Sequence, residues 1–246
     1  MNAMRKVLVY IIFVWIAQLG AQQNLCLPSV SAKEKITKHR AYYTSYSHSM
    51  GQPLWVAYEL HRTRLIKVAK RAGRFKTDPL ISPKTVSHDD YTHSGFDRGH
   101  LAPAADMAWS SVTMKESFYT SNICPQRPGF NRGIWKNLES LIRNWASDES
   151  HLFIVTGPIF KNDATQIGKT SKISVPSHFF KAVLDTAGED KCLAFVIPNY
   201  KSKSPIESYA VSVDQLEEML GRDLFPALDD EVESRIESAY RFEDWD

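Results

Sequence analysis

Hydrophobic residues along this chain follow two spacings, one helical and one typical of strands. From Ile134 onward, apolar positions recur three and four residues apart, which lines them along one face of a helix that we expect to end near Ala146. Four shorter runs, rich in branched and aromatic residues, predict strands over 54–60, 152–156, 179–184 and 193–197. Because the helix needs an apolar surface to pack on, the pattern predicts an α+β fold with a central mixed or antiparallel sheet flanked by helices.

Three local signals refine this picture. Ser212 and Gln215 form a capping-box pattern, and Gly221 stands where a left-handed glycine ends a helix, so we predict a helix between them. Residues 118–120 form a short aromatic run that predicts a strand. Residues 73–95 carry frequent Gly, Pro and Asp, which predicts a long irregular connection, and connections of that length are usually functional or disordered.

The N-terminus has the composition of a targeting segment. Arg5 and Lys6 precede an apolar run over residues 7–17, and Gly20 and Ala21 supply small residues for cleavage, so the pattern predicts a secretory signal peptide. The apolar run is shorter than the ~20 residues that a membrane-spanning helix needs, which favours cleavage over a retained anchor. We therefore expect a secreted or periplasmic protein with no membrane contact after cleavage.

The rest of the chain predicts one compact domain. Of its 246 residues 43% are hydrophobic, and no repeat interrupts them, so one substantial core is expected. Behind the predicted signal peptide (1–21), residues 22–50 are polar and Tyr-rich and are interpreted as an N-terminal arm or the approach to a first strand. Residues 51–246 are interpreted as the domain itself.

Charge is unevenly distributed although its total is small. The formal net charge of +2 disappears when Arg5 and Lys6 are removed, so overall charge says little about partners. Residues 33–103 hold 13 Lys and Arg against 6 Asp and Glu, whereas residues 207–246 hold 3 against 13. A basic front and an acidic tail fit a polyanion site on one side of the molecule, although solvated faces alone would produce a similar asymmetry.

The three cysteines, Cys26, Cys124 and Cys192, do not have the spacing of zinc ligands. In an exported protein they allow one disulfide with one thiol left over, and the sequence leaves the pair open. Cys124 lies inside the second motif described below, so packing is its expected role.

The densest cluster of chemically useful residues is Asp97-Arg98-Gly99-His100. A histidine near neutral pKa can accept a proton from water, and a neighbouring guanidinium can hold a phosphate oxygen. Gly99 allows another group to approach the backbone closely. These are the parts of phosphodiester hydrolysis, although an isolated Asp-Arg pair is more often a structural ion pair.

A second cluster begins at Asn122-Ile-Cys-Pro-Gln126 and continues through Asn131, Trp135 and Glu139, which are four residues apart. At 100° per residue on a helix, Glu139 falls within ~80° of Asn131, so both would project from one side. An amide oxygen and a carboxylate suit Mg²⁺, which takes oxygen ligands and keeps several waters. The structural alternatives are a helix N-cap for Asn131, a solvated charge for Glu139 and core packing for Trp135, of which we expect the last.

The segment His88-Asp89-Asp90, followed by His93, offers a competing zinc hydrolase. It has no clear scaffold for a third ligand and lies in the turn-rich connection, where His and Asp are usually exposed. Zinc is therefore the weaker of the two metal interpretations.

The two motifs together resemble the signature of the sugar-non-specific DNA/RNA endonucleases, the family of endonuclease G. Further segments in matching order extend the resemblance over roughly residues 54–228: Thr156-Gly-Pro-Ile-Phe160, Val175-Pro-Ser-His-Phe-Phe-Lys181, Val196-Ile-Pro-Asn199 and Val211-Ser-Val-Asp214. Several ordered motifs at matching spacing are far more specific than any one of them. The resemblance implies a ββα-metal (His-Me finger) core, in which a β-hairpin presents the histidine and the following helix presents a magnesium ion.

The family resemblance also implies a role for each site residue. His100 would be the general base, Asn131 the single direct protein ligand of Mg²⁺, and Glu139 a carboxylate that orients water on the ion. Arg98 and Asn122 would steady the catalytic site, with Asn122 assigned to substrate binding.

The family uses a further arginine, upstream of the histidine, against the scissile phosphate. The match in this chain is imprecise by a residue, so Arg74 is our assignment and Arg71 the fallback. Either guanidinium would bind the substrate and stabilise charge that develops on the phosphate during the reaction.

These residues predict a secreted Mg²⁺-dependent endonuclease that cuts DNA and RNA with little sequence preference and leaves 5′-phosphate ends, with Mn²⁺ able to substitute. Phosphate contacts carry no sequence information directly, and attack by water needs no ribose 2′-hydroxyl. The resemblance implies DNA and RNA as partners and a homodimer. The alternative is a catalytically silent, nuclease-like domain that binds nucleic acid, which loss of His100, Asn131 or Glu139 would indicate; all three are present.

Overall fold

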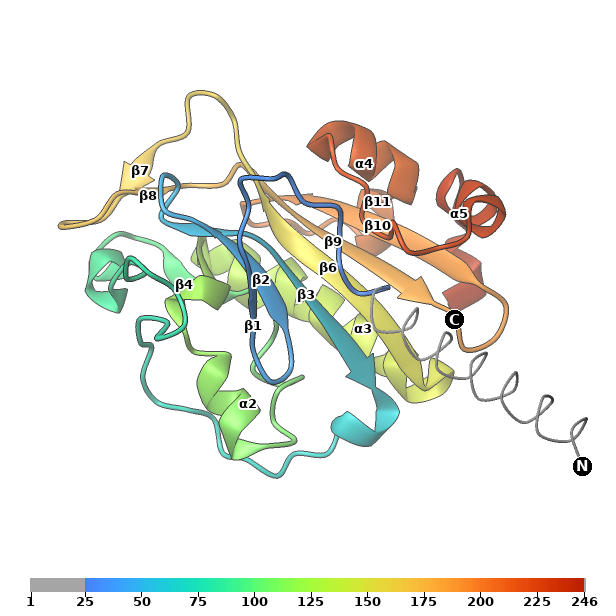
Figure 1. Ribbon diagram of the computed structural model, residues 1–246, viewed down its shortest axis with the longest axis horizontal. Coiled ribbons are helices and arrows are strands. Elements are labelled where there is room, and N and C mark those ends of the chain that lie inside the picture. The colour runs from blue at the N-terminus through green and yellow to red at the C-terminus, as the bar shows by residue number, and fades with distance from the viewer. Residues whose placement is uncertain (1–24, 246) are drawn as a thin grey trace, which may run out of the picture.

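A computed structural model describes residues 25–245, and its centre is one sheet of seven strands (Figure 1). Every neighbouring pair in this sheet is antiparallel, which decides between the mixed and antiparallel sheets left open by the sequence. In spatial order the strands are β1 (Ile36–Lys38), β2 (Tyr43–Ser47), β3 (Gln52–His61), β6 (His151–Ile159), β9 (His178–Asp185), β10 (Lys191–Pro198) and β11 (Ala210–Val211).

Two small ribbons and a set of helices surround this sheet. Strand β4 (Asp97–His100) pairs with β5 (Ile123–Gln126), and β7 (Gln166–Ile167) pairs with β8 (Ile173–Ser174). The α-helices of the described residues are α2 (Ser111–Glu116), α3 (Lys136–Glu149), α4 (Val213–Leu220) and α5 (Asp230–Glu237). Short helical turns are η1 (Arg62–Arg64), η2 (His88–Tyr91), η3 (Thr120–Asn122), η4 (Phe130–Trp135), η5 (Ile206–Tyr209) and η6 (Phe242–Trp245).

The central strands are buried on both faces and separate two cores. Successive side chains of a strand point to opposite sides. In β3, Val56 and Tyr58 therefore pack with α3, whereas Trp55 and Ala57 pack with α4 and α5. Figure 1 shows α4 and α5 away from α3, with the sheet between them.

The strongest periodic signals of the sequence are confirmed. Each of the four predicted strand runs lies inside an observed strand, and α3 continues to Glu149, three residues past the predicted end. The capping box is present: Gln215 N donates to Ser212 Oγ over 3.2 Å, and Ser212 N donates to Gln215 Oε1 over 3.1 Å. Gly221 ends α4 in the left-handed region with φ 60°.

The strand predicted over residues 118–120 is wrong. Phe118 N and Tyr119 N donate to Lys115 O and Glu116 O, so this segment continues the turns of α2 instead of joining a sheet. The strand of this region is β5, which starts at Ile123. Phe118 is buried and packs against His100, and an aromatic residue buried in a turn gives the same sequence signal as one buried in a strand.

Part of the segment interpreted as an N-terminal arm belongs to the sheet. Strands β1 and β2 extend it beyond β3, and Tyr42 between them is fully buried. The sequence signal was weak because polar residues alternate with tyrosines here and each strand is short. The predicted signal peptide (1–21) lies outside the described residues.

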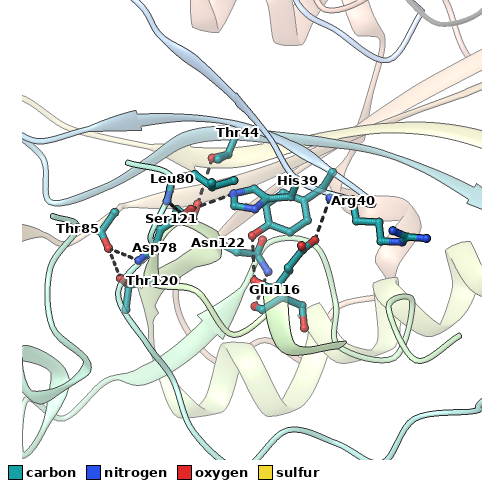
Figure 2. A network of polar contacts seen from close by, with 12 residues as sticks. His39, Arg40, Thr44, Asp78, Leu80, Thr85, Glu116, Thr120, Ser121 and Asn122 are labelled. Carbon is teal, nitrogen blue, oxygen red and sulfur yellow. Dashed lines mark hydrogen bonds and ion pairs between the residues drawn. The ribbon is translucent and has the colours of Figure 1, made fainter. Parts of the chain in front are cut away.

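A buried polar network anchors the long connection 73–95, which is irregular apart from η2 (Figure 2). The Asp78 carboxylate pairs with His39 Nε2 over 2.9 Å and accepts a hydrogen bond from Ser121 Oγ. Asp78 N also donates to Thr85 Oγ1 over 2.9 Å. Asp78 therefore ties this connection to the β1–β2 turn and to η3, which directly precedes β5.

The cysteines Cys26, Cys124 and Cys192 are free and buried, so the disulfide that the sequence allowed does not form among them. Burial raises the pKa of all three thiols, which keeps them protonated and inert. Cys124 packs in the core on the α3 face, as expected. Within residues 25–245, no helix has the length and apolar character needed to cross a membrane.

Candidate active site

Strand β4 carries His100 at its end and is held beside β5 by a close contact at Gly99. A Cβ on Gly99 would overlap the side chain of Gln126 in β5. The close approach predicted for Gly99 is therefore made by the neighbouring strand. Both polar atoms of the Gln126 amide are buried without a hydrogen-bond partner among the described residues. The motif gave Gln126 no role, but this unsatisfied amide lies beside the strand that carries His100.

The His100 imidazole is enclosed by aromatic rings and is neutral at ordinary pH. Its ring centroid lies 4.8 Å from Phe118 and 5.5 Å from Phe75. Burial, and secondarily the charge of Arg71, lowers the pKa of His100 to about 3. Within the described residues, His100 Nε2 is buried and has no hydrogen-bond partner, so this nitrogen can accept a proton from a bound molecule.

Asn131 lies before α3, in the π-helical turn η4, and not on the regular helix. The backbone leaves helical geometry at Gly133 (φ −108°, ψ −113°), so a rotation of 100° per residue does not relate Asn131 to Glu139. The sequence argument that placed both on one helix side is corrected here. Asn131 is also not an N-cap, because Gly129 occupies that position.

Asp97, at the start of β4, fixes the Asn131 amide. Asn131 Nδ2 donates to Asp97 Oδ2 over 2.9 Å, and Arg132 donates to the same carboxylate over 2.8 and 2.6 Å. Asp97 therefore pairs with Arg132 and not with its neighbour Arg98. No described residue donates to Asn131 Oδ1, which leaves the amide oxygen available as a ligand.

Glu139, in the first turn of α3, lies within a cluster of buried charges. The cluster contains Lys181 from β9, which is 0% exposed, and the ion pair between Asp106 and Arg143, with N···O of 2.8 Å. Burial raises the pKa of Glu139, and the charge of Lys181 opposes this shift most strongly. Two carboxylates and two cations thus compensate each other inside the α3 face of the protein.

Lys181 is a residue that the motif contained and the sequence analysis left without a role. Its Nζ donates to Leu101 O, directly after His100, over 3.3 Å. The same ammonium lies 5.0 Å from the Trp135 ring centroid and 5.7 Å from that of Tyr58. Lys181 therefore connects the sheet to the segment after His100 and to the charge cluster of Glu139. The sequence signal for a functional role of Lys181 is its position within the mostly apolar run of β9.

Of the two candidate arginines, Arg71 is the one whose surroundings connect it with His100. Its guanidinium lies 5.2 Å from the Phe118 ring centroid, and its charge lowers the pKa of both His100 and Glu139. Both arginines are exposed, and neither makes a hydrogen bond or ion pair within residues 25–245, so the difference between them is the contact of Arg71 with Phe118 and the effect of its charge. The fallback arginine is therefore better positioned than the first assignment.

Asn122 and Arg98 both steady the backbone around His100. Asn122 is fully buried: its Oδ1 accepts from Ala102 N over 2.8 Å, and its Nδ2 donates to Ala102 O and Ser117 O. The Arg98 guanidinium donates to His88 O over 2.6 and 3.1 Å. The amide of Asn122 is occupied by these internal contacts, which a direct contact with substrate would have to replace.

The alternative zinc segment does not assemble a site. Asp90 is buried, and its Oδ1 accepts from Thr170 N and Ser171 N over 2.8 and 3.1 Å. His88 and Asp89 are exposed and face each other over 3.3 Å. Within residues 25–245, the groups of three metal-ligand atoms that lie close together do not include these residues.

Chemically, the candidate residues supply a neutral imidazole, a guanidinium, an amide oxygen and a carboxylate. A proton acceptor and a cation beside each other suit hydrolysis of an anionic ester, and the oxygen donors suit a hard divalent ion. A family model for DNA/RNA non-specific endonucleases matches residues 26–231. This chain belongs to that family.

Relatives in the DNA/RNA non-specific endonuclease family support the assignment. "Nuclease EXOG, mitochondrial" of Danio rerio is 34% identical and covers 82% of this chain and 63% of that protein. "Endonuclease G, mitochondrial" of Homo sapiens is 31% identical and covers 76% and 68%. "Nuclease C1" of Cunninghamella echinulata var. echinulata is 32% identical and covers 78% and 83%. The chain spans 63%, 56% and 55% of the lengths of three EXOG relatives that it matches.

A solved structure shares the fold of this family member. The crystal structure of an EndoG/EndoGI complex superposes with a TM-score of 0.75 at 28% identity, covering 84% of this chain and 91% of that chain. The α+β fold inferred from the resemblance is therefore confirmed, with the sheet fully antiparallel.

The predicted secreted or periplasmic location is wrong. The relatives from Danio rerio and Homo sapiens, and the "Mitochondrial nuclease" of Saccharomyces cerevisiae, are named as mitochondrial nucleases. Mitochondrial targeting segments are also basic and poor in acidic residues. The Arg5-Lys6 start and the absence of Asp and Glu before residue 24 therefore do not distinguish the two destinations.

Proposed function

We propose that this family member is a nuclease that hydrolyses DNA and RNA with little sequence preference, depends on Mg²⁺ and leaves 5′-phosphate and 3′-hydroxyl ends. The observation that carries the proposal is the buried, neutral His100 with its unpartnered Nε2, beside Arg71. A catalytic base must be unprotonated and must have a nitrogen free to take up a proton, and His100 meets both conditions.

Asn131 and Glu139 are the residues that would hold the metal ion. Asn131 Oδ1 has no donor among the described residues, and the Glu139 carboxylate accepts no hydrogen bond there either, so both donors are available to a hard cation. Mg²⁺ bound there would supply a Lewis acid that stabilises charge on the phosphate and on the leaving oxygen.

The chain's own residues account for the remaining chemistry. His100 Nε2 would accept a proton from the attacking water, and Arg71 would bind a non-bridging phosphate oxygen. Lys181 and Asp97 would hold the segment after His100 and the Asn131 amide in place. None of these groups reads a base edge, which agrees with cleavage of many sequences. The homodimer implied by the family resemblance belongs to the same proposal and is tested by light scattering of the full chain.

Cleavage assays on plasmid DNA, single-stranded DNA and RNA, with Mg²⁺ or with EDTA, test this function. We expect cleavage of all three in Mg²⁺ and none in EDTA. His100→Ala should cut ~10² to 10⁴-fold more slowly, because general-base catalysis is lost, and added imidazole should restore part of the rate. Asn131→Ala should instead need more Mg²⁺, because its amide oxygen is gone.

Four results would contradict the proposal. Equal cleavage in EDTA would show that the reaction does not depend on a metal ion. Cleavage of RNA alone, with cyclic phosphate ends, would indicate attack by the ribose 2′-hydroxyl. Full activity of His100→Ala with unaltered circular dichroism would place the base elsewhere. Nucleic-acid binding without any cleavage would indicate the silent domain.

A further inference from the structure

Helices α4 and α5 lie beside each other on the sheet face away from α3 (Figure 1). Their apolar sides pack on the sheet through residues such as Leu216 and Ile236. The two helices also bring acidic groups together: Asp214 and Glu217, three residues apart on α4, meet the buried Glu237 of α5. One carboxylate oxygen from each of the three lies within 4.8 Å of the others.

Glu237 is the unusual member of this cluster. The residue is 0% exposed, and both of its carboxylate oxygens are buried without a hydrogen-bond partner within residues 25–245. Buried carboxylates in folded proteins are paired, hydrogen-bonded or bound to a metal ion, because an uncompensated one is costly. An ordinary solvated acidic patch therefore does not explain Glu237.

The surroundings of Glu237 contain further carboxylates and, among the described residues, no compensating cation. Burial first, and then the charges of Glu217, Glu233 and other acidic neighbours, raise the pKa of Glu237 to about 9. The arginines nearest to Glu237 in sequence have other partners: Arg235 faces Asp190 over 3.8 Å, and Arg241 faces Asp244 over 3.6 Å. Arg222, which follows α4, pairs with Glu34 over 2.5 Å. The compensation for this cluster must therefore come from solution, as protons or as a bound cation.

We propose that Asp214, Glu217 and Glu237 bind a Ca²⁺ ion that joins α4 to α5. All three donors are carboxylate oxygens, which hard cations prefer, and Ca²⁺ accepts six to eight oxygens in flexible geometry, whereas Mg²⁺ demands an octahedron and releases its waters reluctantly. The neighbouring Cys192 thiol is protonated by burial and donates to Ile236 O, so it offers no thiolate to a softer metal.

The burial gradient of the three ligands gives the ion an entry route. Asp214 is exposed, Glu217 is partly buried and Glu237 is buried, so an ion can reach the inner carboxylate from solvent. Glu237 lies beyond the family match, which ends at residue 231. The cluster joins α4 and α5 and is distinct from the candidate active site on the other face of the sheet.

Thermal unfolding of the full chain, freed of metal with EDTA and then titrated with CaCl₂ alone, tests this site. At about 100 times the dissociation constant, Ca²⁺ should raise the Tm by roughly 5–10 °C, and MgCl₂ should raise it less. Glu237→Gln should remove the Ca²⁺ shift while its metal-free Tm equals or exceeds that of the wild type. Asp214→Asn, at an exposed position that leaves the fold intact, should need at least ~10-fold more Ca²⁺.

Two control variants test whether the Ca²⁺-induced rise in Tm comes from the α4–α5 cluster. Glu218→Gln changes an exposed acid of α4 outside the cluster, and Asn131→Ala changes the candidate active site; both should keep the full Ca²⁺ shift. The proposal is overturned if wild type shows no Ca²⁺ shift, since the cluster then holds protons instead of an ion. It is also overturned if Asp214→Asn and Glu237→Gln both keep the wild-type response. If Glu237→Gln does not fold, Asp214→Asn alone decides.

Discussion

The two faces of the central sheet each enclose a group of carboxylates, and the two groups are compensated differently. On the α3 face, Glu139 shares its surroundings with Lys181 and Arg143. On the α4–α5 face, Glu237 meets Glu217 and further acids, with no cation opposite them among the described residues. A glutamate thus lies once, partly buried, in a nearly neutral setting and once, fully buried, in a strongly negative one.

This difference shows how a buried charge can be stabilised from inside or from outside the chain. Lys181 and Arg143 belong to the fold itself, so the charge of Glu139 is balanced as soon as the sheet and α3 have packed. The α4–α5 group lacks such partners and depends on protons or on a cation from solution. The first arrangement keeps its charge balance in any solution, whereas the stability of the second depends on pH and on the cations in solution.

The largest effect is expected from removing a cation on the compensated face. Lys181→Met should lower the free energy of unfolding by about 3–5 kcal/mol, because Glu139 then loses the buried positive charge that compensates it most. Urea denaturation in EDTA measures this loss. Glu237→Gln under the same conditions should be neutral or stabilising, since it removes a charge that has no partner. Equal effects of the two variants would abolish the distinction between the faces.

A smaller effect is expected from the arginine that acts on the candidate active site. Arg71→Ala should lower the cleavage rate by about 10²-fold, because a cation that stabilises developing phosphate charge is lost. The matched control Arg74→Ala, three residues away and exposed, should leave the rate nearly unchanged. Initial rates on plasmid DNA at saturating Mg²⁺ decide between them. The reverse order would restore Arg74 as the phosphate-binding residue and remove Arg71 from the site.

The smallest effect concerns acid stability. The folded-state pKa of His100, about 3, lies below the unfolded value of 6.5. The unfolded state therefore takes up a proton below pH 6.5 while the folded state does not, and stability falls as the pH falls toward 3. At pH 5 this amounts to about 2 kcal/mol. His100→Ala should consequently lose about 2 kcal/mol less stability than wild type between pH 7 and pH 5.

Denaturation curves at the two pH values measure this difference, with His88→Ala, at an exposed histidine, as the control. The folded-state pKa values of Glu217 and Glu237 are raised, so these groups stabilise the fold as the pH falls and cannot produce a loss of this sign. An identical pH dependence of wild type and His100→Ala would mean that His100 is solvated in solution.

Local pattern was sufficient for several parts of this fold. Ser212, Gln215 and Gly221 specify both ends of α4, because the capping bonds and the left-handed glycine involve only neighbouring residues. Long apolar runs specify the central strands, because burial on both faces leaves no other position for them. At β1, β2 and residues 118–120 the run of strand-forming residues is short. The aromatic residues there indicate burial, but they do not show whether a strand or a turn is buried.

The candidate site divides in the same way. The identities of His100, Asn131 and Glu139 follow from ordered motifs, since proton transfer and oxygen ligation each need particular side chains. The break in the helix at Gly133 could not be read from spacing, because a glycine within a periodic segment is compatible with a straight helix as well.

The sequence by itself determined the family and the residues that carry the expected chemistry. It also determined the central strands and the capped helix α4. Each of these depends on neighbours along the chain. Tertiary structure alone decided which arginine acts on His100, that Lys181 is buried beside Glu139, and that Glu237 meets Asp214 and Glu217. These relations join residues far apart in sequence, and their charges interact through space and through the amount of solvent that packing excludes.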